Sequence, residues 1–160
     1  MRALAIGQNV DQIIDYGEKK MIAPGDLYIM DVASFTKDLY RMGNATWPAF
    51  TEDRARSDVA ILKQDGIETV IANGNGFSAF DHLTKIMKKP GKKVWKIKKG
   101  ATLPPELKLV KDKRPGHEGH YMIAPAKNMP LKKYLGALEE LGLDRSKVQI
   151  ITAGGLSNVG

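Results

Sequence analysis

The chain has 160 residues, the length of one ordinary domain, and 42% of them are hydrophobic, so we expect a single domain over residues 1–152 and a flexible tail over 153–160. It contains no cysteine, which excludes disulfide scaffolds, thiolate nucleophiles, zinc fingers and iron–sulfur clusters. The formal net charge of +7 permits an anionic partner and does not choose among a nucleic acid, a phosphorylated cofactor and an acidic protein.

We expect neither a membrane span nor a secretion signal. No apolar run reaches the roughly 20 residues that cross a bilayer. Gln8, Asn9 and Asp11 interrupt the apolar start before the core of a signal peptide forms. We therefore expect a protein that acts in the cytoplasm and has no membrane partner.

The first half of the chain predicts short elements separated by turn residues. A Pro24-Gly25 turn precedes a segment rich in aromatic and branched residues, and Gly43-Asn44 would stop a helix. The expected elements are a helix over 9–17, a strand over 26–35, a helix over 36–42, a surface loop over 47–58 and a strand over 67–72.

The second half begins with a turn and ends with the clearest helix. Two Asn-Gly pairs in 73–76 favour positive φ and a reversal of the chain. Ser78, with Asp81 three residues later, resembles a capping box, which predicts a helix over 78–88. Further strands are predicted over 92–99, 106–111, 120–124 and 148–152, and a helix over 130–141. Without a regular βαβ alternation, these elements predict an α+β domain with small antiparallel sheets.

Twelve of the 25 lysine and arginine residues lie between Lys85 and Arg114, against two acidic residues. Apolar residues interleave with the lysines there, so we expect a folded segment with a cationic face rather than a disordered tail. Trp95 and Ile97 would lie on one side of a strand, and the lysines on the other. The segment fits a nucleic-acid groove with a stacking tryptophan, and equally a solvated strand face with Trp95 in the core.

The chemical motifs of the sequence are weak on their own. His117 and His120 are spaced for metal binding, but the pattern lacks a third ligand. Gly74-Asn75-Gly76 is neither a dinucleotide fingerprint nor a P-loop, and a structural turn is its simpler interpretation. No GxSxG motif surrounds Ser78, for which an N-cap is the simpler role.

Three longer stretches carry a resemblance to a known family. They are GNGFSAFD at 74–81, ATLPPELKLVKD at 101–112 and HYMIAPAKNMP at 120–130, and Leu27-Tyr28 adds a shorter match. They resemble the ADP-ribosyltransferase-like toxin family of the second exported effector of a type VI secretion system. The resemblance covers roughly residues 26–130 and is dense from 74 onward.

The resemblance implies a fold and a substrate. The fold would be ADP-ribosyltransferase-like, with two small, opposed, mostly antiparallel sheets and flanking helices. The activity would be that of an antibacterial toxin that binds NAD and transfers ADP-ribose or cleaves NAD. Such a site grips the ribose, sandwiches the nicotinamide and stabilises the positive charge that develops when the glycosidic bond breaks.

The resemblance also assigns roles to individual residues. Ser78 would hydrogen-bond the ribose or carboxamide region, and His120 would hold a ribose hydroxyl, although a buried strand histidine is the alternative. Gly76 would let the backbone approach the ligand. Phe80 and Tyr28 would be aromatic walls.

The sequence departs from the family pattern at three points. Ile29 stands where the family carries arginine after Leu-Tyr, so Arg54, Arg56 or a lysine from 92–99 would have to meet the pyrophosphate. Phe77 replaces the family residue before the serine. No Gln-x-Glu or Glu-x-Glu motif occurs near a late strand, which leaves Glu118 and Glu106 as candidates for the catalytic carboxylate.

The expected partners follow from the toxin hypothesis. A neutralising immunity protein or antitoxin, acidic in charge, would meet the cationic face, and components of a secretion apparatus could deliver the toxin. One alternative is a basic nucleic-acid-binding domain without enzymatic activity. Another is an NAD-dependent transferase whose acceptor is a nucleic acid.

Overall fold

The computed structural model describes residues 21–30 and 35–151. The helix expected over 9–17 and the tail over 153–160 lie outside these residues, as do positions 31–34 of the strand expected over 26–35. Of that strand, the structure describes β1 (Leu27–Met30), which follows a short 3₁₀ helix, η2 (Pro24–Asp26). No helix in the described parts of the chain is long and apolar enough to span a membrane.

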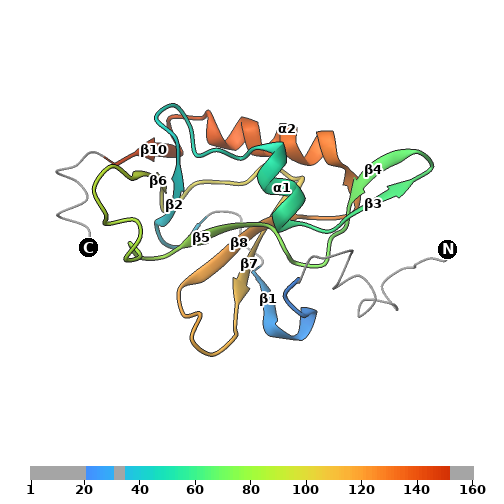
Figure 1. The fold of residues 1–160 in the computed structure, drawn as a ribbon, viewed down its shortest axis with the longest axis horizontal. Coiled ribbons are helices and arrows are strands. Elements are labelled where there is room, and N and C mark those ends of the chain that lie inside the picture. The colour runs from blue at the N-terminus through green and yellow to red at the C-terminus, as the bar shows by residue number, and fades with distance from the viewer. Residues whose placement is uncertain (1–20, 31–34, 152–160) are drawn as a thin grey trace.

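A seven-stranded sheet forms the centre of the fold (Figure 1). In spatial order its strands are β1, β7 (Leu107–Asp112), β8 (His120–Pro125), β5 (Phe77–Phe80), β2 (Leu39–Gly43), β6 (Lys93–Ile97) and β10 (Val148–Ile150). Neighbouring strands of this sheet pair in antiparallel fashion. Both β5 and β8 therefore have partners on each side.

A second, three-stranded antiparallel sheet extends from one end of the first. It consists of β3 (Ile61–Gln64), β4 (Ile67–Val70) and β9 (Met129–Pro130), with β4 in the middle. The expected α+β class with antiparallel sheets is confirmed. The finer expectation, two sheets opposed around a cleft as in ADP-ribosyltransferases, stays a prediction.

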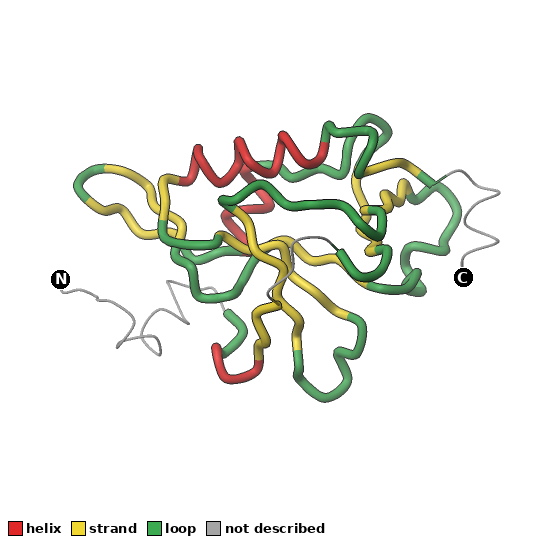
Figure 2. The backbone as a smooth tube through the Cα atoms, turned by 180° about the vertical axis from the view of Figure 1, so that it is seen from behind, coloured by secondary structure: helices red, strands yellow, loops and turns green. Residues whose placement is uncertain are grey.

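Two helices cover one face of the large sheet, as Figures 1 and 2 show from opposite sides. They are α1 (Glu52–Asp58) and α2 (Leu131–Gly142). The apolar stripe of α2 faces the main core, which includes Phe77 and Ile123 from the sheet. The buried Tyr134 hydroxyl donates a hydrogen bond to the Ile123 carbonyl at 2.7 Å, so helix and sheet are joined by a polar contact as well.

The other face of the sheet carries two smaller apolar clusters. One contains Tyr40, Leu83, Met87 and Val94, and the other contains Val110, Met122 and Ala124 with Ile22 and Leu27 packed against them. The side chains of β5 that lie between these clusters are only partly buried. This strip of the sheet is where polar groups can meet both the interior and the surface.

Two of the expected helices are wrong. Residues 36–42 were expected to be helical, but Leu39–Gly43 form β2, whose first three side chains are all buried. The helix expected over 78–88 is replaced by β5 and a series of turns, so Ser78 is not an N-cap. Phe80, Leu83 and Met87 have the spacing of a helix because the chain after β5 folds back and packs Leu83 and Met87 on Tyr40.

The expectation of a loop over 47–58 is wrong in its second half. Thr51 accepts a hydrogen bond from the backbone N–H of Arg54 and caps α1, and Ala55 turns into the core. A seven-residue helix with a single apolar residue, Ala55, leaves little periodic signal. The remaining expected elements over 67–72, 92–99, 106–111, 120–124, 130–141 and 148–152 correspond to described strands and a helix.

Trp95 lies in the core, with only 2% of its surface exposed, and its indole N–H donates to the Asn44 carbonyl at 2.8 Å. The core interpretation of this residue is therefore confirmed. Trp95 is not available to stack on a base, which removes the aromatic element of the nucleic-acid alternative.

Arg41 is a buried cation that joins three segments. Its Nε donates to the Pro48 carbonyl at 3.0 Å and its Nη1 to the Ser78 carbonyl at 2.6 Å, while its guanidinium lies over the rings of Phe50 and Phe77. Burial lowers its pKa to about 10, so it stays charged at neutral pH.

Replacing Arg41 with leucine is expected to destabilise the fold by about 2–3 kcal/mol, because the Ser78 and Pro48 carbonyls would lose a charged donor in a buried place. Urea unfolding of Arg41→Leu beside the wild type measures this. A midpoint equal to that of the wild type would contradict it.

Candidate functional site

The register of the central strands brings four predicted or polar residues onto one face. Phe80 of β5 pairs with His120 of β8, and Ser78 pairs with Met122. Val110 of β7 also pairs with Met122, so Asp112, two residues further, lies on the same face. This is the face opposite α1 and α2. Ser78, Phe80, His120 and Asp112 therefore meet between the two smaller clusters.

Ser78, His120 and Asp112 form one hydrogen-bonded chain. The Ser78 hydroxyl lies 2.8 Å from Nε2 of His120, and Nδ1 of His120 lies 2.7 Å from Oδ2 of Asp112. The side chain of Asp112 has no exposed surface, and that of His120 has 10%. Ser78 is partly exposed. The chain thus runs from the interior toward the surface and ends at the serine.

Arg114 keeps the buried end of this chain charged. Its Nε donates to Oδ1 of Asp112 at 3.0 Å and its Nη2 to Oδ2 at 2.7 Å. Burial works to raise the pKa of the Asp112 carboxyl, but the hydrogen bonds from Arg114 and His120 and the charge of Arg114 outweigh it, and the pKa lies well below its ordinary value. Because a carboxylate can only accept, Nδ1 of His120 carries the proton between them. In the neutral form of the ring, Nε2 therefore accepts a hydrogen bond from the Ser78 hydroxyl.

The lowered pKa of Asp112 has a consequence for acid stability. A carboxyl whose pKa is lower in the folded than in the unfolded protein stabilises the fold above the unfolded value, about 3.9, and this contribution is lost as the pH falls below it. Asp112→Asn is therefore expected to lower stability at pH 7 and to flatten the decline between about pH 4 and 2. Thermal unfolding of both proteins across this range checks it; parallel curves would contradict it.

Phe80 adds an aromatic surface to the site. Its ring centroid lies 4.9 Å from that of His120, with an interplanar angle of 32°. One side of the imidazole is therefore covered by an apolar ring, while its two nitrogens are engaged in the plane. Ser78, His120 and Phe80, which the family resemblance singled out, are brought together.

Gly76 lies just before β5, but its small size serves the protein itself. A Cβ at this position would collide with the Ile123 carbonyl oxygen, so the close backbone approach is between β5 and β8. The preceding Asn75 is buried, and its side-chain amide exchanges two hydrogen bonds with the backbone of Ile22, at 3.0 and 3.1 Å. With Gly74 at φ +93°, the structural-turn interpretation of this segment is confirmed.

The structure does not bring Tyr28, Arg54 and Arg56 to this site. Tyr28 pairs with Lys111, which places it on the other face of the sheet, where it is 54% exposed with the Lys113 ammonium 5.9 Å from its ring centroid. Arg54 and Arg56 lie on α1, which covers the helical face of the sheet, opposite the face that carries Ser78. Arg56 is paired with Glu52 and Glu68 at 2.6 and 2.8 Å.

The candidate carboxylates also have other surroundings. Glu118 is exposed in the turn before β8, where its Oε2 accepts from the Gly116 N–H at 3.3 Å; backbone hydrogen bonds from Glu118 itself and Gly116 lower its pKa. Glu106 immediately precedes β7, and its carbonyl accepts from Ala126. Among the contacts of the described residues, neither carboxylate reaches Ser78 or His120.

Of the two lysines that lie within β6, Lys96 is on the same face of the sheet as Ser78. It pairs with Tyr40, which pairs with Phe80. Trp95 and Ile97 point to the main core, as expected from their alternation. Lys96 is therefore the sequence-predicted cation that the register places on the side of Phe80.

His117 lies close to two members of the Ser78–His120–Asp112 hydrogen-bonded chain, and the three residues are of types that bind metal ions. Asp112, His117 and His120 place one potential ligand atom each within 4.8 Å of one another, so Asp112 supplies the third ligand that the sequence pattern lacked. Arg114 contacts both Asp112 oxygens, however, and its Nη2 lies 3.4 Å from Nδ1 of His117. A metal ion would have to displace this guanidinium.

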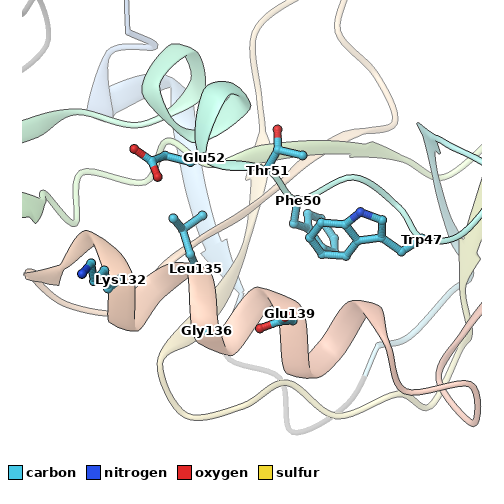
Figure 3. A pocket seen from close by; sticks show the side chains of 8 residues that line it. All are labelled: Trp47, Phe50, Thr51, Glu52, Lys132, Leu135, Gly136 and Glu139. Carbon is cyan, nitrogen blue, oxygen red and sulfur yellow. The ribbon is translucent and has the colours of Figure 1, made fainter.

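A separate groove of about 350 Å³ lies on the helical side of the molecule (Figure 3). Trp47, Phe50 and Leu135 supply its apolar lining, and the remaining lining residues are Thr51, Glu52, Lys132, Gly136 and Glu139. It contains none of the predicted site residues. Two carboxylates against one lysine make it a poor place for a pyrophosphate.

Sequence reasoning missed Asp112 and Arg114. Asp112 stood at the end of a motif that the resemblance quoted, but without the strand register its distance from His120 was unknown. Arg114 holds Asp112, Asp112 orients His120, and His120 in turn orients the Ser78 hydroxyl toward a bound molecule.

The comparisons with known proteins identify the family. A family model described as Tse2 ADP-ribosyltransferase toxin matches residues 37–150, which is more than half of the chain and includes Ser78, Asp112 and His120. Neither a curated protein nor a solved structure matches the chain. The chain belongs to the family of Tse2 ADP-ribosyltransferase toxins.

Proposed function

We propose that the protein is an antibacterial toxin that binds NAD on the Ser78–His120 face of its large sheet and transfers ADP-ribose from it or cleaves it. The family supplies the general activity. The observation that carries the location is the Ser78–His120–Asp112 chain beside the Phe80 ring, because it presents an oriented hydroxyl and an aromatic surface in one place.

Each group has a part in this proposal. Ser78 and His120 interact with the nicotinamide ribose, Phe80 offers an apolar wall to the nicotinamide ring, and Lys96 attracts the pyrophosphate. The bond that breaks in NAD joins the ribose to nicotinamide, which is a good leaving group. The protein residues position NAD and stabilise the charge that develops. Tyr28, Arg54 and Arg56 have no part in it, because they belong to the other face.

The toxin acts in the cytoplasm of the target cell and is neutralised by an acidic immunity protein or antitoxin. Support for a cationic docking surface comes from exposed lysines before, at the start of and after β6, which are Lys85, Lys88, Lys89, Lys92, Lys93 and Lys99. Oppositely charged surfaces accelerate such an association and make it sensitive to salt.

The test is expression of the wild type in bacteria with intracellular NAD followed, beside nicotinamide release from NAD by the purified protein. Growth arrest together with nicotinamide release is expected. Normal growth at confirmed expression, with NAD intact in both assays, would overturn the proposal.

A further inference from the structure

We propose that Ser78 is an activated nucleophile that attacks C1′ of the nicotinamide ribose and forms a covalent ADP-ribosyl–Ser78 intermediate. The identity of the electrophile rests on the proposed function. The activation of the serine rests on the geometry of the described residues alone.

The geometry is that of a serine activated by a histidine which a buried carboxylate orients. The Ser78 hydroxyl is 2.8 Å from Nε2 of His120, and Nδ1 of His120 is 2.7 Å from the buried Asp112. A nucleophile, a base within hydrogen-bond reach and a third group that fixes the base are the three parts such a site needs. All three lie on adjacent strands of one sheet, which holds them in place.

The surroundings fix which nitrogen of the His120 ring faces Ser78. Arg114 contacts Asp112 through two nitrogens, so the carboxylate is held on the far side of the imidazole from Ser78. Phe80 covers one face of the ring at 4.9 Å. The remaining Nε2 lone pair points to the serine, which is the partly exposed member of the chain.

A nucleophile also answers the question of the missing glutamate. The carboxylate closest to the site, Asp112, is buried behind His120 and contacts Arg114, so it does not face a substrate. Glu118 and Glu106 have no contact with Ser78 or His120 among the described residues. A covalent bond from Ser78 would stabilise the electron-poor C1′ carbon in place of a facing carboxylate.

The reaction needs NAD and a water or acceptor hydroxyl, and no other co-reactant. The bond from Ser78 Oγ to C1′ forms while the bond from C1′ to the pyridinium nitrogen breaks, its electron pair neutralises that nitrogen, and the hydroxyl proton moves to Nε2 of His120. After His120 releases this proton to solvent, it takes one from an attacking water or acceptor hydroxyl and returns it to Ser78 Oγ as the C1′–Oγ bond breaks. The net products from water are ADP-ribose, nicotinamide and a proton.

The test uses an NAD analogue with an arabino fluorine at the 2′ position, which slows breakdown of a ribosyl adduct, with intact mass and peptide mapping as the readout. The full-length wild type is expected to gain one analogue-derived group, on Ser78. Ser78→Ala should gain none, and Asp112→Asn should react at least tenfold more slowly. Ser146→Ala and Asp144→Asn, which alter a serine and an aspartate of a distant exposed turn, should behave as the wild type does.

Three results would overturn the proposal: an adduct on another residue, nicotinamide release from the analogue without an adduct, or wild-type turnover of NAD by folded Ser78→Ala. Thermal unfolding checks each variant, and His120→Gln takes the place of Asp112→Asn if that variant does not fold.

A second readout separates this proposal from the proposed function. A fluorophosphonate probe reports an activated serine without NAD. If the wild type releases no nicotinamide, the NAD function fails; labelling at Ser78 that needs His120 would then retain the activated serine, and absence of labelling would overturn it.

Discussion

His120→Ala is expected to lower nicotinamide release from NAD at least about a hundredfold and to abolish growth arrest. The histidine is the only described partner of the Ser78 hydroxyl, and loss of a general base or of its orientation typically costs two to four orders of magnitude. The measurement is single-turnover nicotinamide release by purified protein, followed by growth of cells that express the variant.

His82→Ala is the matched control. His82 is exposed, hydrogen-bonds to the neighbouring Asp81 at 3.0 Å and has no contact with Ser78, so its removal should leave the rate unchanged. If His82→Ala lost as much activity as a folded His120→Ala, or if His120→Ala retained the wild-type rate, the assigned site would be wrong.

Gly76→Ala is expected to destabilise the protein by about 3 kcal/mol, which corresponds to about 6–12 °C in Tm for a chain of this size. The added Cβ would overlap the Ile123 carbonyl oxygen, and the neighbouring contacts are also backbone atoms of Ile123 and Ala124. Neither rotamer changes nor side-chain movement can relieve such an overlap, so β5 and β8 must separate.

Gly136→Ala provides the comparison for this prediction. Gly136 lies in the middle of α2 and an added Cβ meets nothing within 4 Å, so alanine should stabilise the helix by about 0.5–1 kcal/mol. Calorimetry of the two variants measures both signs. A Gly76→Ala protein that melts with the wild type would show that the two strands are not as close as described.

The sequence predicted the later strands and α2 because their patterns are long or strictly alternating. It failed where the pattern was local and misleading. The spacing of Phe80, Leu83 and Met87 imitates a helix, yet it results from a chain that folds back on a central strand. Likewise, β2 has buried residues on both faces, which obscures the alternation typical of a strand.

The grouping of the candidate site residues was predictable in part for a similar reason. Ser78, His120 and Phe80 were identified by resemblance, and the register places them on one face. Asp112 and Arg114 required the pairing of β7 with β8, which no local pattern specifies. Tyr28 was assigned to the site by the same resemblance, but alternation along β1 turns it to the opposite face.

The candidate site lies on β5 and β8, each of which has a strand on both sides, and we expect this position to determine how the activity is lost on heating. Amide protons of inner strands belong to the part of a protein that exchanges with solvent mainly through global opening. We therefore expect the Ser78–His120 geometry to be lost together with the fold. Inactivation by heat should coincide with global unfolding. Amide hydrogen exchange at Ala79 and Met122 should report the same free energy as global unfolding of the domain.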